Sequence, residues 1–161
     1  MTKSNSLSSA GHYNTNYENF QTELYAQIRR EAFGEDIGQN SWLTVDEQDR
    51  FLEWLDLAAG KVLLDVACGA GGPALRIAAI TGCSVVGIDV QEDAIATAKA
   101  LAATRSLAER AQFWAGDATA PLPFPDSNFD AITCIDAINH FPERPRIMME
   151  WAPLLNSSAA R

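Results

Sequence analysis

A glycine-rich stretch between an apolar run and a helix signal constrains the fold of this chain more than any other feature. Val62-Leu-Leu leads into Asp65-Val-Ala-Cys-Gly-Ala-Gly-Gly-Pro73, whose proline suits the first turn of a helix. A short continuous apolar run is typical of a parallel strand that is covered on both faces. Glycines let the backbone turn sharply and approach a ligand. The stretch therefore predicts a strand, a ligand-binding turn and a helix in succession.

Three further apolar runs alternate with helix signals along the rest of the chain. A glycine separates the first helix from the strand Val85-Val-Gly-Ile, and 91–104 is an alanine-rich helix. Ala111-Gln-Phe-Trp-Ala and Ala131-Ile-Thr-Cys-Ile are the next strands, and a helix over about 144–155 follows. This alternation predicts an α/β fold, a doubly wound Rossmann-like parallel sheet of at least four strands in the order 3-2-1-4.

The residues before the first strand are expected to form a tail and a helical cap. Residues 1–16 are polar and aperiodic, which predicts a flexible tail. One helix that ends at Gly34 is predicted from an apolar stripe at helical spacing: Tyr17, Phe20, Leu24, Ile28 and Ala32. Thr44-Val-Asp-Glu47 is a capping-box pattern that opens a second helix. We expect 17–58 to be the cap and 59–161 the core of a single domain.

Charge and cysteine content exclude several classes of partner. The net charge of −9 disfavours phosphate backbones, which need clustered Lys and Arg, so no nucleic-acid partner is expected. No apolar run approaches the roughly 20 residues of a bilayer span, and no secretory leader pattern is present, which predicts a cytoplasmic protein without a membrane partner. Cys68, Cys83 and Cys134 are odd in number and lack C-x-x-C spacing. We expect reduced, mostly buried thiols and no metal site.

Carboxylates follow each of the first three predicted strands. Because a doubly wound sheet binds ligands at the carboxyl ends of its strands, Asp65, Asp89 and Asp117 are expected at one edge. Asp89 follows Gly69 by about 20 residues, the spacing at which a carboxylate accepts hydrogen bonds from ribose hydroxyls. The N-terminus of the helix after the glycines offers unpaired N–H groups. These residues predict a nucleoside ligand.

The nucleoside is not identified by these features alone. Gly69-x-Gly71-x-x-Ala74 followed by Asp89 also satisfies the dinucleotide fingerprint, so an NAD(P)-binding oxidoreductase is one alternative. A non-catalytic nucleoside-binding domain is a second alternative. Asp65, the segment Gly-Asp117-Ala and the Pro-rich loop that leads to Asp130 tilt the balance away from NAD(P), while the non-catalytic alternative stays open.

Four segments resemble, in order and spacing, the class I S-adenosylmethionine-dependent methyltransferases, over about 61–140. They are Asp65-x-x-Cys-Gly-x-Gly-Gly, Gly-Ile-Asp89, Gly-Asp117-Ala and Leu122-Pro-Phe-Pro-Asp-x-x-Phe-Asp130. The resemblance is to small-molecule members of the family. It implies S-adenosyl-L-methionine as cofactor, S-adenosyl-L-homocysteine as product and a small-molecule acceptor as partner.

The resemblance also assigns roles to residues. Asp65 would orient the glycine loop and the methionine ammonium group, and Asp89 would hold the ribose. Asp117 would accept from the adenine amino group while the Ala118 N–H donates to a ring nitrogen. Ala67 stands where many members have a glycine. The expected cofactor-binding residues are Asp65, Ala67, Cys68, Gly69, Gly71, Asp89, Val90, Asp117, Ala118 and Cys134.

The end of the fourth strand is where the resemblance places the chemistry. Asp136-Ala-Ile-Asn-His140 resembles a segment of phosphoethanolamine and sarcosine/dimethylglycine N-methyltransferases. It implies catalytic roles for His140, whose neutral imidazole can accept a proton near pH 7, and for Asp136, which would line the acceptor pocket. A histidine at a strand-to-helix junction can equally be a structural hydrogen bonder. Phe33-Gly-Glu-Asp-Ile-Gly38 resembles the cap of those enzymes, with Trp42 placed either in a lid or in packing.

The C-terminal residues depart from the family pattern. Glu150-Trp-Ala-Pro-Leu-Leu stands where members lead into a Lys-Pro-Gly-Gly turn and three further strands. The resemblance therefore implies a C-terminally truncated fold whose fourth strand is an unpaired edge.

Three of the four tryptophans are expected to pack in the core: Trp54, Trp114 and Trp151.

Overall fold

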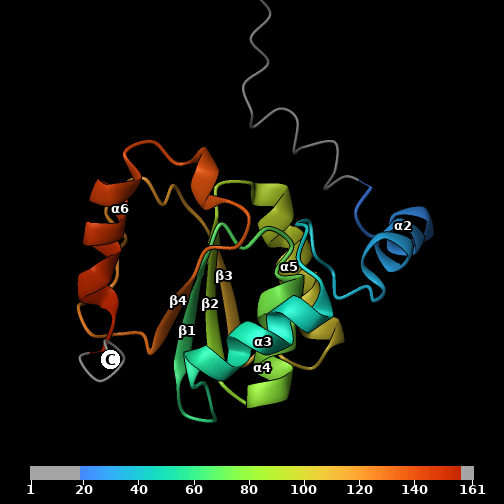
Figure 1. The fold of residues 1–161 in the computed structure, drawn as a ribbon, viewed down its shortest axis with the longest axis horizontal. Helices are drawn as coiled ribbons and strands as arrows, with labels where there is room; N and C mark the ends of the chain where they lie inside the picture. Colours follow the sequence, from blue (N-terminus) through green and yellow to red (C-terminus); the bar gives the residue numbers. More distant parts are fainter. Residues whose placement is uncertain (1–18, 157–161) are drawn as a thin grey trace, which may run out of the picture.

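A computed structural model describes residues 19–156, which form a parallel sheet with helices on both faces (Figure 1). In chain order the elements are α2 (Glu23–Phe33), α3 (Val45–Leu55), β1 (Val62–Val66), α4 (Gly72–Thr81), β2 (Ser84–Asp89), α5 (Glu92–Thr104), β3 (Ala111–Ala115), β4 (Ala131–Thr133), the 3-10 turn η1 (Ile138–His140), α6 (Arg144–Trp151) and the 3-10 turn η2 (Ala152–Leu154). The strands are parallel in the order β3-β2-β1-β4, which confirms the predicted topology.

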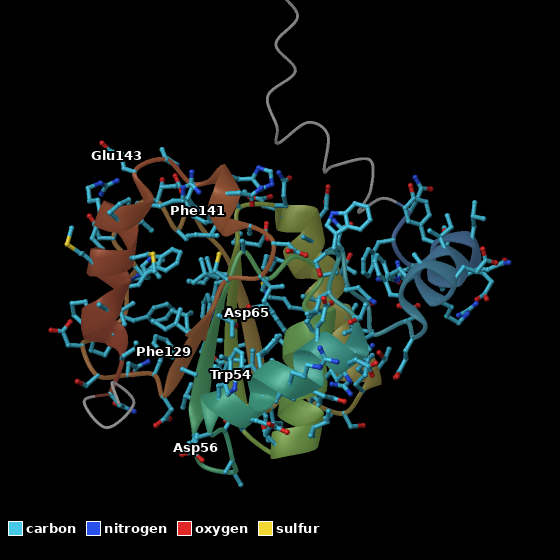
Figure 2. The ribbon with its side chains drawn as sticks, in the orientation of Figure 1. Trp54, Asp56, Asp65, Phe129, Phe141 and Glu143 are labelled. Carbon is cyan, nitrogen blue, oxygen red and sulfur yellow. The ribbon has the colours of Figure 1, made fainter. Side chains whose placement is uncertain are left out.

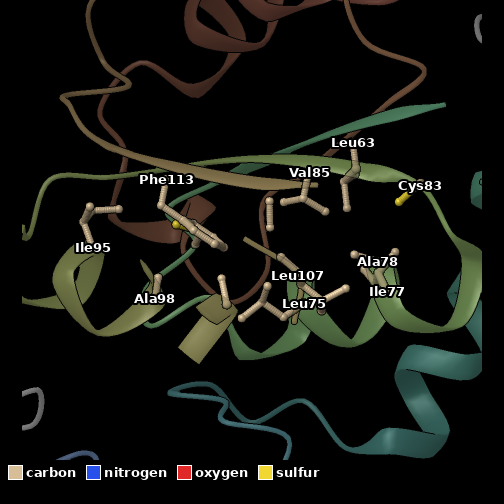
Figure 3. Close-up of a cluster of buried hydrophobic side chains, with 14 of the residues drawn as sticks. Leu63, Leu75, Ile77, Ala78, Cys83, Val85, Ile95, Ala98, Leu107 and Phe113 are labelled. Carbon is tan, nitrogen blue, oxygen red and sulfur yellow. The ribbon is translucent and has the colours of Figure 1, made fainter. Parts of the chain in front are cut away.

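Two apolar clusters lie on the two faces of the sheet. Successive side chains of a strand point to opposite faces, so Leu63 of β1 packs with α4 and α5 while Leu64 packs with α6. Figure 3 shows the first cluster, in which Phe113 of β3 lies beside Ala98 of α5. Because β1 is buried on both faces, its sequence is a continuous apolar run up to Asp65.

The edge of the sheet at β4 differs in part from the expectation. Ala131–Thr133 pair with β1, so the strand ends before the predicted Ile135, and the backbone turns at Asp136, whose φ is +54°. At the start of the strand, Leu155 forms a parallel bridge with Phe129. The chain that returns from η2 therefore covers the beginning of this edge, while within residues 19–156 the β4 residues themselves pair on one side only.

The first predicted helix is shorter than expected. Within the described residues α2 begins at Glu23, since the Thr22 hydroxyl caps it by accepting from the Tyr25 N–H. Phe20 precedes the helix and is buried under the Arg29 guanidinium, 4.2 Å from the ring centroid. Leu24 is 63% exposed and Ile28 is also exposed, so the single apolar stripe was wrong. Tyr17 and the predicted tail 1–16 lie outside the described residues.

The capping box that opens the second helix is confirmed. The Thr44 hydroxyl accepts from the Glu47 N–H at 3.3 Å, and the Glu47 carboxylate accepts from the Thr44 N–H at 3.0 Å. The apolar face of α3, carried by Phe51, Leu52 and Leu55, packs on the cluster beside α4. α3 is thus in contact with the helices on one face of the sheet.

Two of the three tryptophans expected in the core are on the surface. Trp54 is 81% exposed and lies on the outer side of α3 (Figure 2), and Trp114 is 55% exposed on the edge strand β3. Trp151 is buried, as predicted, against Phe141.

The three cysteines agree with the expectation of mostly buried thiols: Cys68 and Cys83 are buried, and Cys134 is half-buried. No helix within 19–156 has the length and apolar character that a bilayer crossing requires.

Candidate active site

A cavity of about 350 Å³ opens at the carboxyl ends of the strands. This volume lies in the range of small-molecule sites, which is roughly 300–1,000 Å³. The loops after all four strands contribute to its wall, and so does the segment 35–43 between α2 and α3, here called the cap segment, through Asn40 and Ser41. The predicted site residues that line it are Asp65, Ala67, Cys68, Gly69, Asp89, Val90, Asp117, Ala118, Asp136 and His140. Figure 2 labels Asp65 and Phe141, two of the residues that line the cavity.

Asp89 holds the glycine loop by hydrogen bonds to the backbone. Its Oδ2 accepts from the Gly69 N–H at 2.8 Å and its Oδ1 from the Gln91 N–H at 2.9 Å. Burial raises the pKa of Asp89, and these N–H donors oppose that rise. The carboxylate is consequently fixed between the loop after β1 and the start of α5, at the cavity wall.

The glycine loop uses a left-handed backbone at three positions. Ala67, Gly69 and Gly71 have φ values of +56°, +54° and +74°. Glycine adopts this region without strain, whereas a side chain with a Cβ does so only at a conformational cost. This explains why a glycine is common at the Ala67 position in the family that the sequence resembles.

Replacing Ala67 with glycine is expected to raise the free energy of unfolding by about 0.5–1 kcal/mol, because relief of the left-handed strain exceeds the added entropy of the unfolded chain. Ala70→Gly is the matched control, since Ala70 is buried and has no positive φ, and it should lower stability. Urea unfolding of both variants measures the difference. Equal losses in the two variants would contradict the strain argument.

Two predicted cofactor contacts lie behind the cavity wall. A Cβ on Gly71 would lie 2.8 Å from the Phe113 ring, so this glycine permits close packing of the loop on β3. Cys134 packs in the cluster beside α6, where burial and then the charge of Asp65 raise its pKa to about 12. Neither residue lines the cavity. Spacing along the chain located them near the site without distinguishing packing from contact.

Asp117 and Ala118 present polar groups at the end of β3. Both hydrogen bonds that the Asp117 carboxylate accepts within 19–156 fall on Oδ1, from the Thr119 N–H at 2.8 Å and the Thr119 hydroxyl at 2.7 Å. These bonds lower the pKa of Asp117. In the same part of the chain the Ala118 N–H donates to no backbone group. An acceptor and a donor are therefore adjacent at this corner of the cavity.

Asp65 is the most deeply buried carboxylate of the site, with 4% of its surface exposed. Its Oδ1 accepts a hydrogen bond from the Thr133 hydroxyl at 2.7 Å. Burial raises the pKa of Asp65 to about 7; the Thr133 bond opposes this rise and the charge of Asp89 adds to it. A carboxylate in such a place favours a cationic ligand group.

Asp136 is engaged with the cap segment. Its Oδ2 accepts from the Trp42 N–H at 2.7 Å, a bond between residues 94 positions apart. The Trp42 side chain is exposed and meets the Phe33 ring edge-on, so it packs on the cap rather than in the core. His140 lies in η1 at the cavity wall. Sequence reasoning found both residues but could not reveal the bond between Asp136 and the cap segment.

Comparison with known proteins places the chain in one family. Residues 63–158 match the family described as methyltransferase domain. The 27-O-demethylrifamycin SV methyltransferase of Amycolatopsis mediterranei is 30% identical over 142 residues, which cover 83% of this chain and 52% of that protein. The chain spans about half the length of this curated relative and less of two others that it matches.

Solved structures show the same fold. An S-adenosylmethionine-dependent methyltransferase of Geobacter sulfurreducens, in complex with S-adenosyl-L-homocysteine, superposes with a TM-score of 0.63 at 23% identity, over 73% of this chain and 47% of that one. SpnF, a cyclase, is 34% identical with a TM-score of 0.61, over 73% of this chain and 44% of its own. The matched family, the identity to the first relative and the strand order together show that this chain belongs to the class I S-adenosylmethionine-dependent methyltransferase family.

Proposed function

We propose that this domain binds S-adenosyl-L-methionine and transfers its methyl group to a small-molecule acceptor. The observation that carries the proposal is the convergence of Asp65, Asp89 and Asp117 on one cavity, with a bent glycine loop between them. The cavity wall contains carboxylates and His140 but, within 19–156, no Lys or Arg. The negative potential of such a wall favours binding of a cofactor that carries a sulfonium and an ammonium group.

The electrostatics argue against the dinucleotide alternative. NAD(P) carries a negatively charged diphosphate, and the acidic wall would repel it. The same wall suits adenosine, because Asp89 can accept from ribose hydroxyls and Asp117 can accept from the adenine amino group through Oδ2. Ala118 would donate its N–H to the adenine ring. Val90, whose side chain is exposed in the wall, would pack on the base.

Methyl transfer needs alignment and exclusion of water more than it needs acid-base groups. When bound, the cofactor would supply an electrophilic methyl group on sulfur, for in-line attack by the acceptor with S-adenosyl-L-homocysteine as the leaving group. In our proposal Asp65 and the backbone of Ala67 to Gly69 orient the methionine end, while the cap segment excludes solvent. His140 would accept a proton from an acceptor that is attacked in its protonated form. Asp136 would position the cap segment, because its carboxylate accepts from the Trp42 N–H. This role is in addition to the catalytic role that the sequence predicts for Asp136.

The acceptor is proposed as a small molecule. The names of relatives support this class: they methylate a rifamycin, sterols and, in an ajmaline N-methyltransferase of Rauvolfia serpentina that is 32% identical over 117 residues, an alkaloid. The net charge of −9 is unfavourable for nucleic acid. A cytoplasmic location belongs to the same proposal, supported by three cysteines without a disulfide partner in the described residues.

Calorimetry with S-adenosyl-L-homocysteine tests the cofactor assignment. We expect saturable binding of this product and none of NADH at the same concentration. Asp117→Ala should weaken the product about tenfold, because a hydrogen bond to a charged acceptor is lost. Asp126→Ala, which removes an exposed carboxylate outside the cavity, is the matched control and should bind as the unchanged protein does. Binding of NADH, or an unaffected Asp117→Ala variant, would contradict the proposal.

SpnF gives one specific reason to consider a second function, since a cyclase shares this fold at 34% identity. This fold can therefore serve a reaction other than methyl transfer. Incubation with S-adenosyl-L-methionine labelled in the methyl group, and a panel of hydroxylated and amine acceptors, separates the two. Label in an acceptor supports methyl transfer, and product binding without any label transfer supports the second function.

A further inference from the structure

We infer that Thr133 is a positioning residue for cofactor binding: its hydroxyl holds the Asp65 carboxylate ionised and oriented toward the cavity. This inference rests on the proposed function for the role of Asp65. The Thr133 hydroxyl donates to Asp65 Oδ1 at 2.7 Å, and Thr133 as a whole residue is only 8% exposed. The bond is thus shielded from water, where a hydrogen bond to a charge is strongest.

Sheet register explains why the donor comes from β4. Asp65 of β1 is directly opposite Gly87 of β2 and Thr133 of β4. Gly87 has no side chain, and a Cβ there would lie 2.4 Å from the Phe113 ring. Within 19–156 the Thr133 bond is the only hydrogen bond that the Asp65 carboxylate accepts. A single hydroxyl therefore determines which oxygen of Asp65 is tied down and leaves Oδ2 for a ligand.

The groups around Asp65 leave the Thr133 hydroxyl as the contact that favours its ionised form. Asp89 on β2 is a second carboxylate whose charge raises the pKa of Asp65, and the neighbouring thiols Cys68 and Cys134 bring no positive charge. No Lys or Arg within 19–156 lines the cavity. Removal of the Thr133 donor must therefore raise the pKa of Asp65 further, because the other influences, burial and Asp89, both favour the neutral form.

The inference predicts a pH-dependent loss of affinity. In Thr133→Val the methyl replaces the hydroxyl at nearly equal volume, so Asp65 becomes neutral over a wider pH range and loses its attraction for the methionine ammonium. We expect the dissociation constant for S-adenosyl-L-homocysteine to rise about tenfold or more at pH 6.5 and much less at pH 9. The ratio of variant to unchanged protein at each pH cancels ionisation of the ligand. Thr133→Ser should restore the unchanged profile.

Two controls separate positioning from a structural role. 5′-Methylthioadenosine lacks the ammonium group, so its affinity should be the same for Thr133→Val and the unchanged protein at both pH values. Thr81→Val removes a partly buried threonine hydroxyl outside the cavity and should leave the pH profile unchanged. A ratio for S-adenosyl-L-homocysteine that does not change with pH, or an equal loss for 5′-methylthioadenosine, would overturn the inference.

A measurement without ligand separates this inference from the proposed function. Urea unfolding of Thr133→Val should show a destabilisation that grows as pH rises through about 7, where Asp65 ionises in the folded protein. In an Asp65→Asn background the effect of Thr133→Val should not change with pH. If these unfolding results hold while neither protein binds the product, the proposed function fails and the coupling of Thr133 to Asp65 stands. If Thr133→Val does not fold, Thr133→Ala serves for both measurements.

Discussion

A protein that carries Gly72→Ala is expected to lose about 2–3 kcal/mol of stability and to release the cap segment from the core. A Cβ at this position would lie 2.1 Å from the Gly38 carbonyl oxygen and 2.3 Å from that of Ile37. Both are backbone atoms, so a side-chain rotation cannot relieve the clash. Alanine is otherwise the better helix former by about 1 kcal/mol, and α4 begins at Gly72. The clash outweighs this preference.

Urea unfolding and hydrogen exchange of residues 35–43 measure this effect. Gly60→Ala is the matched control, because Gly60 has a φ of +88° but open space around it, and its loss should be limited to backbone strain of about 1 kcal/mol. The cap segment should exchange faster in Gly72→Ala only. Affinity for S-adenosyl-L-homocysteine should also fall, since Asn40 and Ser41 leave the cavity wall. Equal stability of the two variants with unchanged exchange would refute the close approach.

The sheet was predictable because its strands carry a local signal. β1 and β2 are apolar runs bounded by glycine or polar residues, as a parallel strand covered on both faces requires. β3 is an edge strand in which buried and exposed residues alternate. The exposed tryptophans mark the limit of this signal. Trp114 alternates with the buried Phe113 on β3, and hydropathy alone does not say which face of an edge strand is covered. The prediction that Trp54 packs in the core was wrong for a similar reason, since Phe51, Leu52 and Leu55 already form the face of α3 that packs on the core.

The candidate site was predictable as far as strand ends determine it. Asp65 and Asp89 lie in the last residues of β1 and β2, and Asp117 follows β3. The carboxyl ends of parallel strands meet at one edge, where these residues line one cavity. The bond from Trp42 to Asp136 depends instead on how the cap segment crosses the sheet, which no local pattern encodes. Thr133 is recognisable in the sequence as a hydroxyl residue within the apolar run Ala131-Ile-Thr-Cys-Ile. That it contacts Asp65 follows only from the register of β4 against β1, which the sequence does not reveal.

Replacing Asp65 with asparagine is expected to stabilise the ligand-free protein while removing most of its affinity for the cofactor. Burial raises the pKa of Asp65 from 3.8 to about 7 in the folded protein. Between these values the folded protein binds more protons than the unfolded chain, so the free energy of unfolding falls as pH rises, by roughly 4 kcal/mol in total. Asparagine keeps an oxygen for the Thr133 hydroxyl and carries no charge. We expect a gain of about 2 kcal/mol or more at pH 8 and little gain at pH 4.

The same substitution tests whether a buried charge is retained for binding. Asparagine cannot offer a carboxylate to an ammonium group, so affinity for S-adenosyl-L-homocysteine should fall by about a hundredfold at pH 8. Urea unfolding at pH 4 and pH 8, with calorimetry at pH 8, measures both effects on one variant. Asp130→Asn changes a carboxylate that accepts from the Val62 N–H outside the cavity, and it should keep the affinity of the unchanged protein. A loss of stability at pH 8 in Asp65→Asn would contradict the expectation that the buried Asp65 charge destabilises the ligand-free protein.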